Sequence, residues 1–483
     1  MSETVIINTN EGPVRGLCEN KVLSFLGVPY AKPPVGPLRL KGPEKPEPRT
    51  EVLDCTTPAP MPVQVLPPGH PMKDHPMSED CLHLNIWAPE NPGKPCAVHV
   101  WFFGGALQGG AADSPELDGS RYAQDGVVSV NVSYRVGVLG FLCHPTMKHE
   151  NPDGLTGNFG HRDQIAALQW IRENIASFGG DPSRVTISGQ SAGSGSCCTL
   201  MNAPLARGLF HRVICHSGDI FQPERDVPLK KAEFQGMELL RSFGCRTLDE
   251  FREIPVEELY ADGDPMMKRV GALCACVIDP AFLPGPQGET TLQNRCMQVP
   301  VIIGTNLDEG SRWKASEYIP AITGRFGLPL DFYASVGDIN AQANALAADY
   351  WYGRHLAWAK TRTQDYQLPT WQYVFARRLG PAGAFHGAEM PYTFGTLEDM
   401  KKSGSALPYE PGDEKLSGLM HSYWVHFIKT GNPNGEGLPL WPEKEGNVHM
   451  QFDLESGMRD DILTETGKTL YPLIEKWMRS RMG

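Results

Sequence analysis

Short apolar runs alternate with amphipathic stretches along the first half of the chain. Runs of strand length, several of them bounded by Pro or Gly, occur at residues 81–89 (CLHLNIWAP), 97–103 (AVHVWFF) and 127–135 (VVSVNVSYR). In residues 163–180 the apolar positions instead recur at helical spacing until Gly179 and Gly180 end the pattern. Another strand is predicted directly afterwards, at residues 184–189. Strand and helix patterns therefore follow one another in sequence.

The second half of the chain continues this alternation. Strands are predicted at residues 299–305 and 370–378, and helices at 417–431 and 470–481. Alternating strands and helices indicate βαβ units and a large, mainly parallel sheet with helices on both faces. We therefore predict an α/β fold with long loop and helix insertions. Without a repeat or a flexible linker to mark a boundary, residues 1–483 are predicted to form one domain, with a mainly helical insertion at approximately 222–295.

Composition and charge narrow the possible partners. The 56 acidic residues outnumber the 44 basic ones, and the formal charge of -12 disfavours nucleic acid, which needs Lys and Arg against its phosphates. No segment contains about 18 uncharged apolar residues, and the amino terminus lacks the pattern of a signal peptide. We expect no membrane contact, a small-molecule partner, and a monomer or weak homo-oligomer.

The strongest chemical motif is Gly189-Gln190-Ser191-Ala192-Gly193. This G-x-S-x-G sequence follows the strand predicted at 184–189 and precedes small residues suited to a helix. A serine hydroxyl becomes a useful nucleophile when it projects from a tight turn beside a base, and glycines remove the Cβ atoms that would collide there. The motif predicts that Ser191 is the nucleophile, the alternative being an ordinary Gly-rich turn.

A second Gly-rich segment lies upstream, where the predicted strand at 97–103 runs into Gly104, Gly105 and Ala106. Acyl transfer through serine needs backbone N–H donors for the oxyanion of the tetrahedral intermediate. We assign these donors to Gly105, Ala106 and Ala192, the last being the residue after the proposed nucleophile. The alternative is a Gly-rich strand end without a catalytic role.

Six segments together resemble one known family. They are FLGVPYAKPPVGPLR, SEDCLHLNIW, NVSYRVGVLGF, GNFGHRDQIAALQWI, GQSAG and GTNLDEG, in that order. They are similar to the type B carboxylesterases, which include cholinesterases and bacterial p-nitrobenzyl esterases, over about residue 5 to Trp441. The resemblance implies the α/β-hydrolase fold and an esterase.

The same resemblance supplies the remaining catalytic candidates. It places the catalytic acid at Glu309 in GTNLDEG, with Asp308 as a rival one position away, and the general base at His386 in AFHGAEM. The order Ser, acid, His is the one expected of α/β-hydrolases. It also implies a supporting role for Ser217 near the acid, and structural ion pairs of Arg39 with Glu79 and of Arg135 with Asp163.

Several positions depart from the family pattern. Gln190 and Phe103 stand where the family commonly has Glu and His or Tyr, which predicts a less charged pocket wall. The loop before SEDC contains no tryptophan, so acylcholine is a poor first guess for the substrate.

The cysteines also depart from the family pattern. Cys81 lacks the cysteine that usually forms a disulfide with it, and Cys55 does not lie at that partner's position, although a disulfide between Cys55 and Cys81 stays open. These cysteines and the amino terminus together predict a reducing, cytoplasmic location.

The sequence thus predicts a serine carboxylesterase that hydrolyses small esters through a Ser-His-Glu triad. Neither a metal nor an organic cofactor is required for acyl transfer through serine. Two alternatives stay open: a hydrolase of amides, carbamates or lactones with the same triad, and a non-catalytic binding protein of the same fold.

Overall fold

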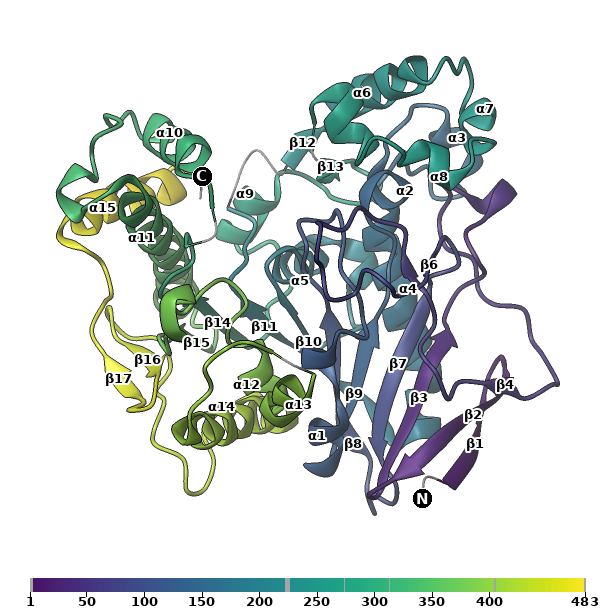
Figure 1. Cartoon of the computed structure of the whole chain (residues 1–483), viewed down its shortest axis with the longest axis horizontal. Coiled ribbons are helices and arrows are strands. Elements are labelled where there is room, and N and C mark those ends of the chain that lie inside the picture. Colours follow the sequence, from purple (N-terminus) through teal and green to yellow (C-terminus); the bar gives the residue numbers. More distant parts are fainter. Residues whose placement is uncertain (1–2, 222–225, 273, 312, 404, 482–483) are drawn as a thin grey trace.

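A large twisted sheet forms the centre of the molecule (Figure 1). The structure is a computed structural model that describes residues 3–221, 226–272, 274–311, 313–403 and 405–481. The strands lie in the order β1 (Glu3–Thr9), β2 (Gly12–Glu19), β3 (Val22–Pro29), β7 (His83–Pro89), β9 (Val127–Val132), β8 (Cys96–Phe102), β10 (Gly180–Gln190), β11 (Arg212–His216), β14 (Val301–Asn306), β15 (Thr370–Phe375), β16 (His449–Phe452) and β17 (Gly457–Arg459).

Strand direction divides this sheet into a parallel centre and antiparallel edges. All neighbouring pairs from β9 to β16 are parallel, whereas β1, β2, β3 and β7 form an antiparallel meander that ends on β9. At the other edge β16 and β17 are antiparallel. The short strand β4 (Leu53–Asp54) pairs with β2, and β5 (Met61–Pro62) pairs with β6 (Met77–Ser78) in a separate small sheet.

Alternating side chains of the central strands bury both faces of the sheet. Along β8, Val98, Val100 and Phe102 join the core on one face, while Ala97 and Trp101 join the core on the other. The first core is covered by α4 (Phe159–Asn174), α5 (Ala192–Asn202), α11 (Ile339–Lys360) and α15 (Glu465–Arg479). The second is covered by α1 (Ser120–Gln124), α12 (Met390–Phe394) and α14 (Pro411–Thr430). The predicted α/β-hydrolase fold, with helices on both faces of the sheet, is confirmed.

Local sequence signals explain where the longer helices begin and end. Helix α11 is capped at its N-terminus by Asp338, whose carboxylate accepts hydrogen bonds from the N–H groups of Asn340 and Ala341. Helix α14 begins with a reciprocal capping box between Glu410 and Asp413 and is ended by the following Gly431, which has a φ of 83°. A helix-ending glycine also closes the segment after α4, where Gly179 has a φ of 79°.

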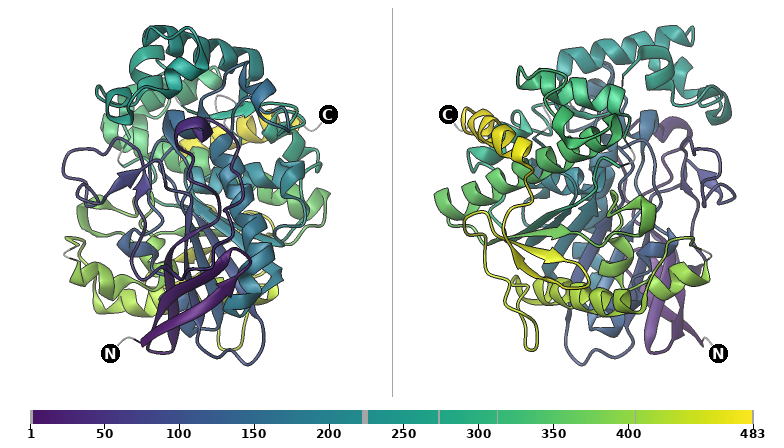
Figure 2. Two further views of the ribbon diagram at one scale, coloured as in Figure 1. Left: turned by 90° about the vertical axis from the view of Figure 1, so that its right-hand side faces the viewer. Right: turned by 60° about the vertical axis from the view of Figure 1, so that its left-hand side comes forward.

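Residues 226–295 are built mostly from helices. They contain α6 (Leu229–Ser242), α7 (Leu248–Arg252), α8 (Val256–Leu259) and α9 (Gln287–Leu292), with one small sheet of β12 (Asp226–Pro228) and β13 (Cys276–Ile278). Figures 1 and 2 place α6, α7 and α8 at the end of the molecule opposite the N-terminus.

Four further short helices lie outside this segment. They are α2 (Gly137–Phe141), α3 (Met147–Glu150), α10 (Ala315–Arg325) and α13 (Leu397–Lys402).

The parallel strands position the candidate site. Residues 104–106 follow β8, Ser191 follows β10, Glu309 follows β14, and His386 lies in the connection after β15. Because the carboxyl ends of parallel strands share one edge of a sheet, segments far apart in the sequence meet there.

Candidate active site

Ser191 occupies a sharp turn between β10 and α5. Its backbone has a φ of 57° and a ψ of -120°, a strained conformation that costs a non-glycine residue about 1–3 kcal/mol. The turn fits because glycines lie two positions before and two positions after the serine. A Cβ atom on Gly193 would lie 2.0 Å from the Phe102 carbonyl oxygen, and one on Gly189 would lie 2.4 Å from the carbonyl carbon of Gly193. The predicted strand, turn and helix around Ser191 are therefore present.

Two main-chain hydrogen bonds fix this turn. The N–H of Ser191 donates to the His216 carbonyl at 2.8 Å, and the Ser191 carbonyl accepts from the N–H of Gly195 at 2.9 Å. The first bond ties the serine to the neighbouring strand β11. The serine itself is partly exposed and lines a small cavity of about 50 Å³ together with Ala192, Gly218 and Trp351.

His386 and Glu309 are in direct contact. Nδ1 of His386 lies 2.5 Å from Oε2 of Glu309, which is completely buried. An ionised carboxylate can only accept, so the proton of this hydrogen bond resides on Nδ1, and Nε2 is the ring nitrogen that carries the basic lone pair. The other carboxylate oxygen, Oε1, accepts from the Thr305 hydroxyl and from the N–H of Asn306, both at 2.8 Å. The pair therefore has the orientation that a general base and its supporting acid require.

The surroundings keep Glu309 ionised. Burial alone would raise the pKa of this carboxyl, but the attraction of His386 and the hydrogen bonds from His386 and from the N–H of Asn306 outweigh it, with a smaller contribution from the nearby Ser217, so the pKa of Glu309 is lowered. Ser217 is fully buried and has a φ of 46°, and its N–H donates to the Gly304 carbonyl at 2.9 Å. The structure thus places Ser217 beside Glu309, as the family resemblance implies.

Asp308, the rival acid, has different partners. Its carboxylate accepts from the Arg378 guanidinium at 3.0 Å, from Asn344 Nδ2 at 2.9 Å and from the N–H of Ala384 at 2.9 Å. These bonds hold the loop that leads to His386. The geometry consequently favours Glu309 over Asp308 as the residue that orients the imidazole.

The loop after β8 packs directly on the serine turn. A Cβ atom on Gly104 would lie 2.5 Å from the Gln190 carbonyl oxygen and 3.1 Å from the Ser191 Cβ atom. The next residues, Gly105 and Ala106, have φ values of 118° and 57°. Among the described residues, the N–H groups of Gly105, Ala106 and Ala192 donate to no protein acceptor. Unpaired donors this close to a serine are what an oxyanion hole requires.

A larger cavity of about 420 Å³ opens beside Gln190. Much of its wall is apolar, and the loop at residues 60–77 contributes apolar residues that include Met61, Val65, Leu66 and Met72. The Gln190 amide nitrogen is buried without a hydrogen-bond partner. Glu116 also lines the cavity, and burial raises the pKa of its carboxyl. The pocket wall is thus less charged than a glutamate at position 190 would make it.

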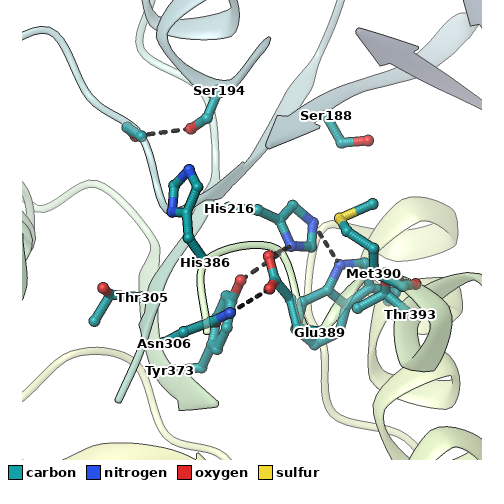
Figure 3. A network of polar contacts seen from close by, with 12 residues as sticks. Ser188, Ser194, His216, Thr305, Asn306, Tyr373, His386, Glu389, Met390 and Thr393 are labelled. Carbon is teal, nitrogen blue, oxygen red and sulfur yellow. Dashed lines mark hydrogen bonds and ion pairs between the residues drawn. The ribbon is translucent and has the colours of Figure 1, made fainter. Parts of the chain in front are cut away.

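The segment of His386 also packs against the serine turn. A Cβ atom on Gly387 would lie 3.6 Å from Nε2 of Gln190, the residue before Ser191. The imidazole also contacts the rings of Trp313 and Trp351, with centroids 6.1 and 5.8 Å away. In Figure 3 it points toward the segment that carries Ser194. His386, Gln190 and Ser191 therefore belong to one compact site.

Several polar residues at this site were not singled out from the sequence. Asn306 and Thr305 contact Glu309, while Glu389 and His216 lie buried behind them. The only available signal for Glu389 is its place three residues after His386 in AFHGAEM. Nothing in the sequence singles out His216 or Asn306, because each acquires its role through pairing of distant strands.

The structure also shows the ion pairs and cysteines named from the resemblance. Arg39 and Glu79 form a two-bond pair at 2.7 and 2.5 Å, and Arg135 and Asp163 form a buried pair at 2.8 and 2.6 Å. These pairs are confirmed. All twelve cysteines, including Cys55 and Cys81, are free thiols.

None of the described helices combines the length and the apolar character needed to cross a membrane. Within the same part of the chain, no three His, Cys, Asp or Glu side chains converge as ligands for a metal ion.

Comparison with known proteins agrees with this geometry. The sequence pattern of the carboxylesterase family matches residues 3–323 and 333–468. The chain belongs to the carboxylesterase family. It is a carboxylic-ester hydrolase, as its named relatives are esterases and hydrolases.

Individual relatives match this carboxylesterase over nearly its whole length. Para-nitrobenzyl esterase of Bacillus subtilis (strain 168) is 33% identical over 498 residues, covering 97% of this chain and 98% of the relative. Fumonisin B1 esterase of Sphingopyxis macrogoltabida is 31% identical over 497 residues, covering 97% and 90%. The solved structure of a thermophilic PNB esterase superimposes with a TM-score of 0.84 at 31% identity, covering 96% of this chain and 99% of that one.

Proposed function

We propose that this carboxylesterase works through Ser191, His386 and Glu309 in two steps. In the first, His386 Nε2 removes the Ser191 proton, the serine oxygen attacks the ester carbonyl, and the imidazolium then gives the proton to the departing alcohol. In the second, water attacks the acyl-enzyme with the same base, which releases the acid and the free serine. Glu309 holds the ring in the required tautomer and stabilises the imidazolium. The 2.5 Å contact between His386 Nδ1 and Glu309 Oε2 carries this proposal.

The N–H groups of Gly105, Ala106 and Ala192 are proposed to bind the oxyanion. Two observations support this assignment. Among the described residues these N–H groups donate to no protein acceptor, and Gly104 packs against Ser191. Removing one such donor typically lowers kcat by about a hundred- to a thousandfold.

The substrate is proposed to be a small, uncharged carboxylic ester with one apolar group. The cavity of about 420 Å³ beside Gln190 can hold that group, whereas the cavity of about 50 Å³ beside Ser191 and Trp351 can hold only a short one. The names of the para-nitrobenzyl esterase relatives support an aromatic ester as the first compound to test. A panel of matched esters, amides, carbamates and lactones would define which acyl groups are accepted.

We also propose a cytoplasmic location. The free thiols of Cys55 and Cys81, and of the other ten cysteines, support a reducing compartment. Fractionation of cells that express the tagged chain tests this point, and recovery outside the cytoplasm would contradict it.

A fluorophosphonate probe tests the catalytic assignment. Such probes phosphonylate an activated serine, so the wild-type protein should be labelled and Ser191→Ala should not. Ser194→Ala is the matched control, because Ser194 lies one helical turn away and its hydroxyl donates to the Gly218 carbonyl at 2.7 Å. It should keep its labelling. Labelling that persists in Ser191→Ala would refute the assignment.

A further inference from the structure

Glu116 is an acidic residue on the wall of the cavity of about 420 Å³ beside Gln190. It lies in the short 3₁₀ helix Pro115–Leu117, which follows the proposed oxyanion segment in the chain. His70 is the only other described residue of this wall that can titrate, and its Nδ1 accepts from the N–H of Met72 at 3.1 Å. No Lys or Arg is among the described residues of the wall. The cavity therefore contains a carboxyl group without a resident cation.

This carboxyl has no partner in the described part of the chain. No other described residue donates a hydrogen bond to it, and no Lys, Arg or His there lies within ion-pair distance. The hydroxyl of the nearby Tyr409 is buried without a hydrogen bond as well. A carboxylate that is partly withdrawn from water and lacks a donor is costly, so Glu116 favours a ligand that supplies a donor.

Buried hydrogen bonds hold the main chain at Glu116 in place. Nδ2 of Asn131, on β9, donates to the Ala112 carbonyl at 2.9 Å and to the Leu117 carbonyl at 2.8 Å. The Thr396 hydroxyl donates to the main-chain carbonyl of Glu116 at 3.0 Å. Asn131 and Thr396 are at most 2% exposed. A fixed main chain keeps the carboxyl at a set distance from the reacting ester, which allows it to discriminate between groups of different length.

The same cavity connects Glu116 with the proposed site of reaction. Gly105, a proposed oxyanion donor, and Gln190, which precedes the nucleophile, also line it. Trp101 and Met390 add apolar surface to its wall. An alcohol group with an apolar body and a hydrogen-bond donor at its far end matches this combination.

We propose that Glu116 is a specificity-determining residue whose carboxylate accepts a hydrogen bond from a hydroxyl at the far end of the alcohol group of the ester. The substrate class is thus the monoesters of short acids with diols. This inference rests on the function proposed above and deepens it, because such esters are small and uncharged. The carboxylate also disfavours an anionic group at the same place, since like charges repel in a partly buried site.

The first test compares ω-hydroxyalkyl acetates with alkyl acetates in which a methyl group replaces the hydroxyl. The acetyl group fits the cavity of about 50 Å³, so the alcohol occupies the larger cavity. The ratio of kcat/KM for the hydroxyl ester to that for the alkyl ester should peak at one chain length, because the main chain at Glu116 is fixed. A ratio that does not depend on chain length would overturn the proposal.

The second test measures this ratio in Glu116→Leu, which removes the acceptor. At the preferred chain length the ratio should fall about tenfold or more, as expected for loss of a hydrogen bond to a charged group. Asp118→Asn is the matched control, because Asp118 lines a different cavity and its carboxylate accepts from the N–H of Ser120 at 2.8 Å. Its ratio should equal that of the wild type. An equal fall in both variants would show that net charge, and not the place of Glu116, sets the preference.

Acetates that end in a carboxylate test the repulsive part of the proposal. The wild type should hydrolyse them less efficiently than the matched alkyl acetates, and Glu116→Gln should recover about tenfold of this loss because it removes the negative charge. Asp118→Asn should recover much less. Equal discrimination by the wild type and Glu116→Gln would overturn the electrostatic role of Glu116.

Active-site titration with the fluorophosphonate probe separates this proposal from the triad itself. A wild-type protein that is not labelled at Ser191 would refute the triad. A wild-type protein that is labelled, yet shows no dependence on chain length, contradicts the role of Glu116 alone. Should Glu116→Leu fail to fold, the nearly isosteric Glu116→Gln still decides the proposal through the esters that end in a carboxylate.

Discussion

The main chain at Gly104 is in contact with Ser191: a Cβ atom on Gly104 would lie 3.1 Å from the Cβ atom of the serine. This contact places the residues that follow β8 beside the turn that follows β10. Gly104 is therefore required for the spacing between the proposed oxyanion donors and the nucleophile.

Gly104→Ala should lower kcat by about a hundredfold, because the added methyl group pushes the loop of Gly105 and Ala106 away from Ser191. Steady-state kinetics with a p-nitrophenyl ester measure this loss. Gly418→Ala is the control, since Gly418 lies exposed in α14 with no neighbour within 4 Å. It should retain full activity and gain about 0.5–1 kcal/mol in stability. Equal activity of both variants would contradict the spacing argument.

Replacing Glu309 with Gln should lower kcat by about a thousandfold or more, because an amide can donate to His386 Nδ1 and so favour the wrong tautomer. Asp308→Asn should lose less than about tenfold, since Asp308 pairs with Arg378 and supports the loop instead. The same kinetic assay compares the two. A larger loss in Asp308→Asn would identify Asp308 as the acid.

Asp163→Asn should destabilise the fold by about 3–5 kcal/mol, because it leaves the buried Arg135 guanidinium without its counter-ion. Urea unfolding measures the change. Glu465→Gln breaks the exposed pair with Lys468 and should change stability by less than about 1 kcal/mol. Similar losses of stability in the two variants would show that the ion pair of Arg135 does not stabilise the fold.

Asp226→Asn should stabilise the protein at alkaline pH. Burial raises the pKa of Asp226 to about 6, so its contribution to stability is complete below the unfolded-state pKa near 3.8 and is lost as the pH rises through about 6. An asparagine avoids this loss, and its amide can donate to Gln287 Oε1, which is buried without a partner, once the Gln287 amide that now donates to Asp226 turns over. At pH 8 the variant should be more stable by roughly 1–3 kcal/mol and at pH 4 no more stable. Thermal melts at both pH values test this, and a gain independent of pH would contradict it.

Much of the parallel sheet could be predicted from the sequence because its strands are buried on both faces and give continuous apolar runs. The strands at 97–103 and 299–305 and the turn at Ser191 are examples. The meander β1 to β3 was not predicted, because these strands mix partly exposed and buried positions. Helix α11 was also missed, since it is buried on most sides and shows no single apolar stripe.

The candidate site, like the fold, could be predicted from the sequence only in part. Local motifs and the family resemblance point to Ser191, Glu309 and His386, but they do not reveal Asn306 or Glu389. The hydrogen bond between Asn306 and Glu389 joins residues 83 positions apart. It forms only because β14 pairs with β15 and the following connection returns to the end of β14. A single sequence carries no local pattern for such a contact.

The most direct measurement of the central claim is mass spectrometry of the acyl-enzyme. Rapid acid quenching during turnover of p-nitrophenyl acetate should trap one acetyl group on the peptide that contains Ser191, and His386→Ala should abolish its rapid formation. An acetyl group on another residue, or equally rapid formation in His386→Ala, would contradict the proposed nucleophile and its base.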